Sequence, residues 1–282
     1  DALGGVMGVL ADKSGLQFKL LNTSKGPAVW SSRSQNDKDL YPLFAQELLL
    51  STKNLTVLNS NIKEILIQAD KVTGVLTEND EIITSNCVIL CSGTFLNGVL
   101  YTGLNGILGG RIDEQSSVSI SKNLLSYGFK TGRLKTGTPP RIDRNSIDFN
   151  KLTSIGGDKY PIPFSFRTSK VKNTLSCHQT TTTEKTHDIL RKGFSESPMF
   201  SGLISGKGPR YCPSIEDKIE RFSEKSSHLI LLEREGLSTD SVYVNGFSTS
   251  LPRHIQQDGL QSIVGLENCK ILKYGYAVEY DY

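Results

Sequence analysis

Cys177 has the sequence surroundings most suited to nucleophilic chemistry. It stands in SCHQTTTTEKTH, a few residues before an expected helix, with Lys185 and two histidines close in sequence. A helix N-terminus and neighbouring cations stabilise a thiolate, the reactive form of cysteine. We therefore expect Cys177 to be a catalytic residue, with Lys185 beside it. The alternative is an inert buried cysteine, the common state of single cysteines.

Three cations lie in a twelve-residue stretch, GRLKTGTPPRID, that contains hardly any apolar residue. Pro139 and Pro140 donate no backbone hydrogen bond and fix their own φ, so we expect a stiff loop rather than a helix or a strand inside a sheet. Such a loop would present Arg133, Lys135 and Arg141 to an anion, such as an RNA backbone. The sequence therefore predicts a cationic wall of a binding cleft.

Two other loops carry groups suited to phosphate. The first follows an expected strand and contains Lys25, Gly26, Pro27 and Arg33. Backbone amides and cations in such a loop can bind phosphate, although a solvated surface loop explains the stretch equally well. In the second, Arg210 and Tyr211 directly precede an expected helix, which suggests an anion-binding and base-stacking corner. A rigid, proline-flanked helix entry is the alternative there.

The apolar pattern predicts the elements that position these groups. We expect helices over 4–15 and 36–51, a strand over 16–21 and an antiparallel meander over 55–84. Residues 87–91 are a continuous apolar run, which predicts a strand buried on both faces in a parallel sheet. Ligands bind beyond the carboxyl ends of such strands, so we expect Gly93 and Thr94 to contact a cofactor. A tight turn that requires glycine is the alternative.

Beyond residue 110 the strands become short, and Gly, Ser, Thr and Pro are frequent. We expect one helix over 183–193, with Thr183 as its N-cap, and a second over 212–222. The pattern is typical of an α/β domain with an inserted or following β-rich α+β region. No GxGxxG fingerprint follows a strand, so either the chain binds no dinucleotide or the fingerprint lies upstream of Asp1.

Composition limits the class of protein. The chain has 282 residues, 37% of them apolar, which is enough for a large core, and no apolar run long enough to span a bilayer. The net charge of +3 is too small to indicate nucleic-acid binding by itself. Its five cysteines form no CxxC pair or metal-binding spacing, so we expect no metal, no membrane contact and a reducing compartment. Because the chain starts without Met and stops after an aromatic run, we also expect a fragment of a longer protein.

Several motifs occur together and in a characteristic order. They are LNTSKGPAVWSSRSQ, SGTFLNG, GGR, GRLKTGTPPRID, the cysteine followed by EKTH, GPRYCPSIEDKI, VYVNGFSTSLP and GYAVEYDY. In this order the chain resembles the glucose-inhibited division protein A family, the large subunit of the enzyme that forms 5-carboxymethylaminomethyluridine in tRNA. The resemblance covers nearly the whole chain, and RLKTGTPPRID and PRYCPSIEDKI are its most specific stretches.

The resemblance implies an FAD-dependent homodimer that works with a GTPase partner on the wobble uridine of tRNA. Methylene-tetrahydrofolate would supply a carbon, glycine or ammonium the nitrogen, and NADH the reducing equivalents. Cys177 matches a family cysteine whose thiolate would add to C6 of uracil. The matching FAD-site positions are Lys25, Gly26, Pro27, Arg33, Gly93, Thr94, Glu279 and Tyr280. The implied fold is a partial Rossmann-like FAD/NAD(P)-binding domain over 1–110 and 251–282, with an inserted β-rich substrate or NADH domain over 111–250.

The chain also departs from the family pattern. The N-terminal GxGxxG unit, a second reactive cysteine and the helical C-terminal domain have no counterpart, so we expect this fragment to be inactive alone. Thr181 and Thr183 stand at usual His and Asn positions, and Arg234 replaces a usual Pro, which we interpret as a neutral surface change. Two other functions stay open: a non-catalytic RNA-binding or dimerisation module, and an NADH-dependent flavin reductase. The compartment would be bacterial cytoplasm or an organelle of bacterial descent.

Overall fold

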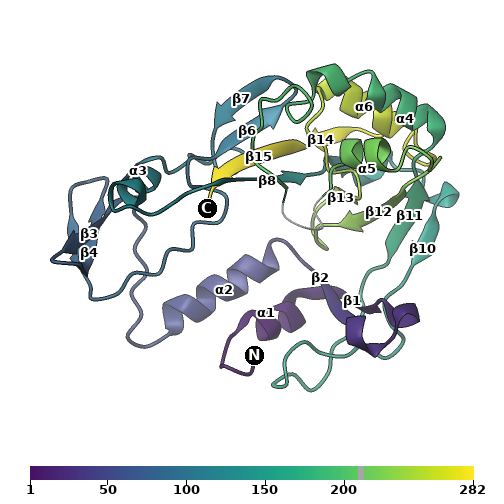
Figure 1. The fold of residues 1–282 in the computed structure, drawn as a ribbon. Coiled ribbons are helices and arrows are strands. Elements are labelled where there is room, and N and C mark those ends of the chain that lie inside the picture. The colour runs from purple at the N-terminus through teal and green to yellow at the C-terminus, as the bar shows by residue number, and fades with distance from the viewer. Residues whose placement is uncertain (209–212) are drawn as a thin grey trace.

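The computed structural model describes residues 1–208 and 213–282, and its fold is a mixed α/β fold (Figure 1). The strands of the described residues form four separate sheets of two, six, four and three strands. Within the described residues, no helix has both the length and the apolar character needed to cross a membrane. The mixed α/β class expected from the sequence is therefore confirmed.

The largest sheet is antiparallel and lies in the region predicted to be β-rich. Its strands follow one another across the sheet in the order β10 (Thr153–Ile155), β11 (Cys177–Thr181), β12 (Leu229–Arg234), β13 (Ser241–Asn245), β9 (Arg141–Asp143) and β14 (Ile271–Lys273). Three helices pack against one face, namely α4 (Glu184–Arg191), α5 (Ile215–Arg221) and α6 (Arg253–Gln261). The opposite face of the sheet carries polar residues and faces β2 (Ser31–Asn36) of the N-terminal segment.

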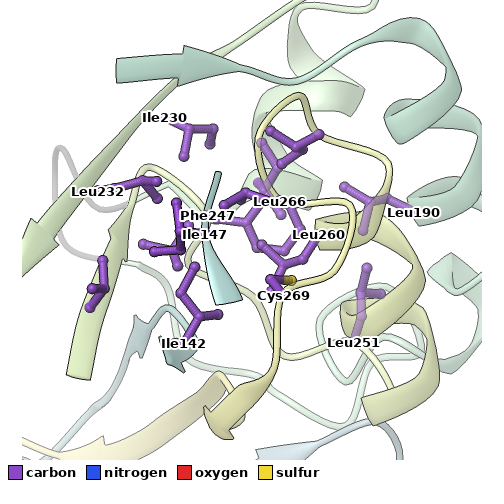
Figure 2. Packing of buried hydrophobic residues seen from close by; sticks show 14 of the residues in the cluster. Ile142, Ile147, Leu190, Ile230, Leu232, Phe247, Leu251, Leu260, Leu266 and Cys269 are labelled. Carbon is purple, nitrogen blue, oxygen red and sulfur yellow. The ribbon is translucent and has the colours of Figure 1, made fainter. Parts of the chain in front are cut away.

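Apolar side chains dominate the core between this sheet and its helices. Figure 2 shows Ile142 and Ile230 of the sheet facing Leu190 and Leu260 of the helices, and all four side chains are completely buried. The expected cap of α4 is confirmed, because the Thr183 hydroxyl accepts a hydrogen bond from a backbone amide in the first turn. Short 3-10 turns complete this region: η3 (Arg144–Ser146), η4 (Phe149–Lys151) and η5 (Phe194–Glu196).

A four-stranded sheet joins the C-terminal strand to the middle of the chain. Its order is β7 (Asn105–Leu108), β6 (Val99–Thr102), β15 (Tyr276–Asp281) and β8 (Arg133–Thr138). A three-stranded meander consists of β3 (Ile62–Gln68), β4 (Lys71–Thr77) and β5 (Ile82–Thr84), as predicted, and α3 (Ser119–Ser126) packs on β3. The predicted domain boundaries at 110 and 250 stay a prediction.

The N-terminal segment forms a smaller unit beside the large sheet (Figure 1). It contains α1 (Met7–Ser14), β1 (Gly15–Leu21), β2 (Ser31–Asn36) and α2 (Leu40–Ser51), with 3-10 turns η1 (Thr23–Lys25) and η2 (Pro27–Val29) between the strands. Both predicted helices and the predicted first strand are confirmed. A loop was expected over 22–35. That prediction was wrong over 31–35, because these residues pair antiparallel with β1.

Two further predictions were wrong. Residues 87–91 form no strand and are mostly exposed, with Ile89 87% exposed, because no described strand pairs with them. The stretch 132–143 is not a loop, because Arg133–Thr138 and Arg141–Asp143 are strands of two different sheets. Only Pro139 and Pro140 lie between those strands, where a missing amide donor costs no ladder hydrogen bond.

Candidate functional site

A cavity of about 510 Å³ lies between β2 and the polar face of the large sheet. We call it the arginine cavity, and the residues that give it chemical character are Arg33, Gln35, Arg141, Glu233, Glu235 and Tyr243. They come from β2, β9, β12, β13 and the residue directly after β12. The structure thus brings together Arg33 and Arg141, which the sequence assigned to different ligands.

Strand alternation explains how the large sheet presents these groups. On β13, Val242 and Val244 are buried in the core, so the intervening Tyr243 points to the opposite face. On β12, Leu232 enters the same core, and Glu233 lies on the cavity side opposite Tyr243. The sheet therefore separates an apolar core from a charged cavity.

Among the described residues, three ion pairs lie in the cavity, one of them between Lys38 Nζ and Glu235 Oε2 at 3.5 Å. A guanidinium nitrogen of Arg33 is hydrogen-bonded to Glu233, and Arg141 Nε lies 3.1 Å from Glu235 Oε1. The Arg141 guanidinium carbon is also 4.7 Å from the centre of the Tyr243 ring, which is a cation–π contact. Burial would raise the pKa of Glu235, but the Ser241 hydroxyl and Arg141 outweigh it and lower that pKa. Glu235 is therefore a carboxylate at neutral pH.

Cys177 lies just behind this cavity on β11. Its side chain is 2% exposed, and its sulfur lies 3.0 Å from Gln35 Oε1 and 3.4 Å from Gln17 Oε1. The Gln35 amide nitrogen donates to the Arg234 carbonyl and the Gln17 amide nitrogen to the Ile155 carbonyl, so both amide oxygens face the sulfur. Oxygen acceptors favour a protonated thiol.

The predicted lowering of the Cys177 thiol pKa was wrong. Burial raises that pKa, the charge of Glu233 raises it further, and Arg33 opposes both only in part. Lys185 is exposed on α4, and none of the charges that act on the thiol comes from it. The neighbouring histidines are also engaged elsewhere: His178 stacks on Phe149, and His187 Nε2 lies 2.8 Å from the Thr182 hydroxyl.

Arg133 and Lys135 are neutralised inside the protein. Arg133 donates to Glu279 at 3.0 Å and to Asp281 at 2.8 Å, both on the adjacent strand β15. Lys135 is 2% exposed, and its ammonium nitrogen lies 3.9 Å from Asp217 of α5. These two cations therefore do not form an exposed wall, and only Arg141 of the predicted group lines the arginine cavity.

The predicted cofactor residues belong to separate parts of the fold. Lys25 and Pro27 lie in the surface turns η1 and η2, with Gly26 at φ +89° between them. Gly93 has a φ of +54° in a turn after the segment 87–91, and the Thr94 hydroxyl donates to the Gly110 carbonyl at 2.7 Å. The alternative given for Gly93, a turn that requires glycine, agrees with this geometry.

Glu279 and Tyr280 lie on β15. One Glu279 oxygen accepts from the amides of Ser205 and Gly206, and the other accepts from Arg133, so both carboxylate oxygens already have protein donors. Tyr280 is half-buried. These residues do not fit a complete dinucleotide site on their own, because the acidic group is fully used within the fold.

Some predicted positions lie outside the described residues, and some functional candidates were missed. Arg210 and Tyr211 lie in the undescribed range 209–212. Within the described residues, no three His, Cys, Asp or Glu side chains are grouped to bind a metal. Glu233 and Tyr243 were missed. Alternation over 241–245, SVYVN, was a visible signal for Tyr243, whereas the apolar run before Glu233 gave none. Arg234 is not a neutral surface residue, because it lines the cavity.

Comparison with known proteins agrees with this fold over its full length. The family model described as glucose inhibited division protein A matches residues 1–282. Two similar relatives are named tRNA uridine 5-carboxymethylaminomethyl modification enzyme MnmG: one from Bdellovibrio bacteriovorus, 50% identical, and one from Thermodesulfovibrio yellowstonii, 48% identical. Both alignments cover all of this chain, but 44% and 45% of those proteins.

One solved structure also matches this chain over its full length. The crystal structure of Aquifex aeolicus GidA in its form I crystal has a TM-score of 0.93 to this chain at 44% identity, covering the whole chain and 48% of the other. This chain thus spans about half the length of the relatives it matches. A family match over every residue, with the same fold, establishes that the chain belongs to the glucose inhibited division protein A family.

Proposed function

We propose that the whole protein, meaning this chain at the full length of its relatives, is an FAD-dependent enzyme that modifies C5 of the wobble uridine in tRNA. It installs an aminomethyl or carboxymethylaminomethyl group, with methylene-tetrahydrofolate as the carbon donor and NADH as the reductant. It acts as a homodimer with a GTPase partner in the bacterial cytoplasm. Relatives named tRNA uridine 5-carboxymethylaminomethyl modification enzyme MnmG support this function.

The observation that carries the proposal is the position of Cys177 behind the arginine cavity. The sulfur contacts Gln35, which lines the cavity, and the charges of Arg33 and Glu233 act on the thiol. Arg33 and Arg141 give the cavity two guanidinium groups that can bind a phosphate or a uracil carbonyl. A thiol beside such groups is suited to a nucleotide substrate.

The chemistry begins with loss of the Cys177 proton. Glu233 lines the arginine cavity together with Gln35, the contact of the thiol, and in this proposal it accepts the proton. The sulfur–C6 bond then forms as the C5=C6 π bond of uracil breaks, and the electron pair moves to the C4 carbonyl oxygen. C5 becomes nucleophilic. Binding of a substrate anion to Arg33 would release Glu233 from its ion pair.

The cofactor assignments belong to the whole protein. FAD would supply redox chemistry when bound, and we derive no step from it, because Glu279 is saturated by protein donors. The finer fold assignment, a Rossmann-like domain over 1–110 and 251–282 with an insert over 111–250, is likewise part of this proposal. Lys25, Gly26, Pro27, Gly93, Thr94 and Tyr280 stay predicted contacts of FAD, and Arg210 and Tyr211 stay predicted contacts of RNA or NADH.

The test replaces single cysteines in the whole protein and measures nucleosides of cellular tRNA by mass spectrometry. We expect Cys177→Ser to abolish the wobble modification and Cys87→Ser, at an exposed cysteine away from the cavity, to retain it. Retained modification in Cys177→Ser would remove this residue from the mechanism. An NADH oxidation rate indifferent to tRNA, with no modified uridine in any variant, would instead indicate a flavin reductase.

A further inference from the structure

A second cavity, of about 540 Å³, lies between the end of α1, the start of β1 and the segment 170–174. We call it the lysine pocket. Its charged lining residues are Lys13, Lys170, Lys172 and Asp12. Three ammonium groups against one carboxylate give the lining an excess of positive charge.

The single carboxylate is already engaged by the backbone. The two oxygens of Asp12 accept hydrogen bonds from the amides of Phe164 and Ser165, at 2.8 and 2.9 Å. Among the described residues, no carboxylate lies within ion-pair distance of Lys170 or Lys172, and both side chains are exposed. Lys13 lies 3.8 Å from Glu47, with both side chains more than half exposed, so that pair is weak.

The segment that carries Lys170 and Lys172 is fixed in place. Figure 1 shows it passing beside α1 and β1. The Asn173 side-chain oxygen accepts from the Phe18 amide at 2.7 Å, and the Thr174 amide donates to the Leu16 carbonyl at 2.8 Å. Val171, between the two lysines, is buried. The backbone that carries the two lysines is therefore in place before any ligand arrives, which reduces the entropy lost on binding.

The lysine pocket shares a wall with the arginine cavity. Asn36 lines the arginine cavity, and its amide nitrogen donates to the hydroxyl of Ser14, which lines the lysine pocket, at 2.9 Å. The same nitrogen donates to the Ala11 carbonyl at 2.7 Å. The two spaces are therefore neighbours in the fold.

We propose that the lysine pocket binds a backbone phosphate of the RNA strand that flanks the nucleotide in the arginine cavity. This inference rests on the proposed function. It assigns the RNA phosphate to Lys170 and Lys172. Ammonium groups bind phosphate as point charges and release condensed counterions, so the interaction is independent of base sequence. It also replaces the role predicted for Arg133 and Lys135, whose charges are satisfied inside the protein.

The test measures binding of a fluorescent anticodon stem-loop RNA to the whole protein at several salt concentrations. For Lys170→Ala with Lys172→Ala we expect affinity about tenfold weaker at low salt and a salt slope smaller by roughly 0.7, because one neutralised phosphate is lost. The charge-preserving Lys170→Arg with Lys172→Arg should bind like the parent. Lys122→Ala, on α3 away from α1 in Figure 1, is the matched control and should change nothing.

A competition experiment distinguishes an RNA backbone phosphate from the phosphate of a small molecule. Inorganic phosphate and AMP are titrated against the RNA complex, and we expect neither to displace the RNA below millimolar concentration. Displacement by micromolar AMP, lost in the double alanine variant, would assign the pocket to a mononucleotide and overturn the proposal. Unchanged RNA affinity and slope in that variant would also overturn it, and the proposed function would survive if Cys177→Ser still abolishes modification.

Discussion

The sulfur of Cys177 lies 3.0 Å from the side-chain oxygen of Gln35, so the thiol donates a hydrogen bond into a network held by backbone carbonyls. That contact joins a strand of the large sheet to a strand of the N-terminal unit. It also fixes the position of the residue on which the proposed chemistry depends.

The first prediction concerns this thiol. Burial and Glu233 raise the pKa of Cys177, so we expect its thiolate absorbance near 240 nm to develop only above the ordinary cysteine range. Glu233→Gln removes the negative charge and leaves Arg33 uncompensated, so the pKa of the Cys177 thiol should fall. The titration is made as a difference against Cys177→Ser. A midpoint that does not move in Glu233→Gln would contradict the assigned influence of that carboxylate.

The second prediction compares cysteines by alkylation at pH 7.5. Cys87 and Cys91 are exposed, whereas Cys269 is 1% exposed and burial raises its pKa to about 11. Iodoacetamide reacts with the thiolate, so in this chain Cys87 and Cys91 should be modified at least about a hundredfold faster than Cys269. Peptide mass spectrometry over time measures each site. Slow modification of Cys87 would mean that residues 87–91 are covered.

The third prediction concerns Arg133. Its guanidinium is the partner of Glu279 and Asp281, which are 5% and 7% exposed. Arg133→Ala leaves two buried carboxylates unpaired and should lower the free energy of unfolding in urea by about 3 kcal/mol. The matched control is Arg111→Ala, which removes an exposed pair with Glu114 and should cost less than about 1 kcal/mol. Equal losses would show that burial of the pair is irrelevant.

The same site has a pH dependence whose sign follows from Glu279. Arg133 and the amide of Gly206 lower the pKa of Glu279 despite its burial. A carboxyl whose folded pKa lies below its unfolded value contributes stability above the ordinary range, and that contribution is lost as pH falls below about 4.5 toward the folded pKa. We expect the stability difference between the parent and Glu279→Gln to shrink in this acidic window.

The fourth prediction concerns Glu216 of α5, for which the pH dependence of stability has the opposite sign. This side chain is completely buried; one oxygen accepts from Thr249 and Ser250, and the other has no partner. Burial raises its pKa, so its contribution to stability is present at acidic pH and is lost as pH rises toward the folded pKa.

The stability of Glu216→Gln relative to the parent should therefore increase as pH rises above 4.5, as measured by urea unfolding at each pH. Glu220→Gln, an exposed position of the same helix, is the control and should show no such trend. A difference between parent and Glu216→Gln that stays constant with pH would contradict a raised pKa.

Local elements followed from the sequence because their signals are local. The helices α1, α2, α4 and α5 were predicted from apolar spacing and caps, and the meander from short β-branched runs between turn residues. The thiol and the cation-rich stretch also drew attention by residue type alone. In each case the information lies within about ten residues of chain.

Tertiary structure alone decided which charges meet. Arg133 is neutralised by Glu279 because β8 pairs with β15, although nearly 150 residues separate them in the chain. Arg141 instead faces the arginine cavity because β9 lies beside β13. Three cations of one short motif therefore have different surroundings, since strand pairing and burial, not residue type, determine whether a charge is compensated inside the fold or available to a ligand.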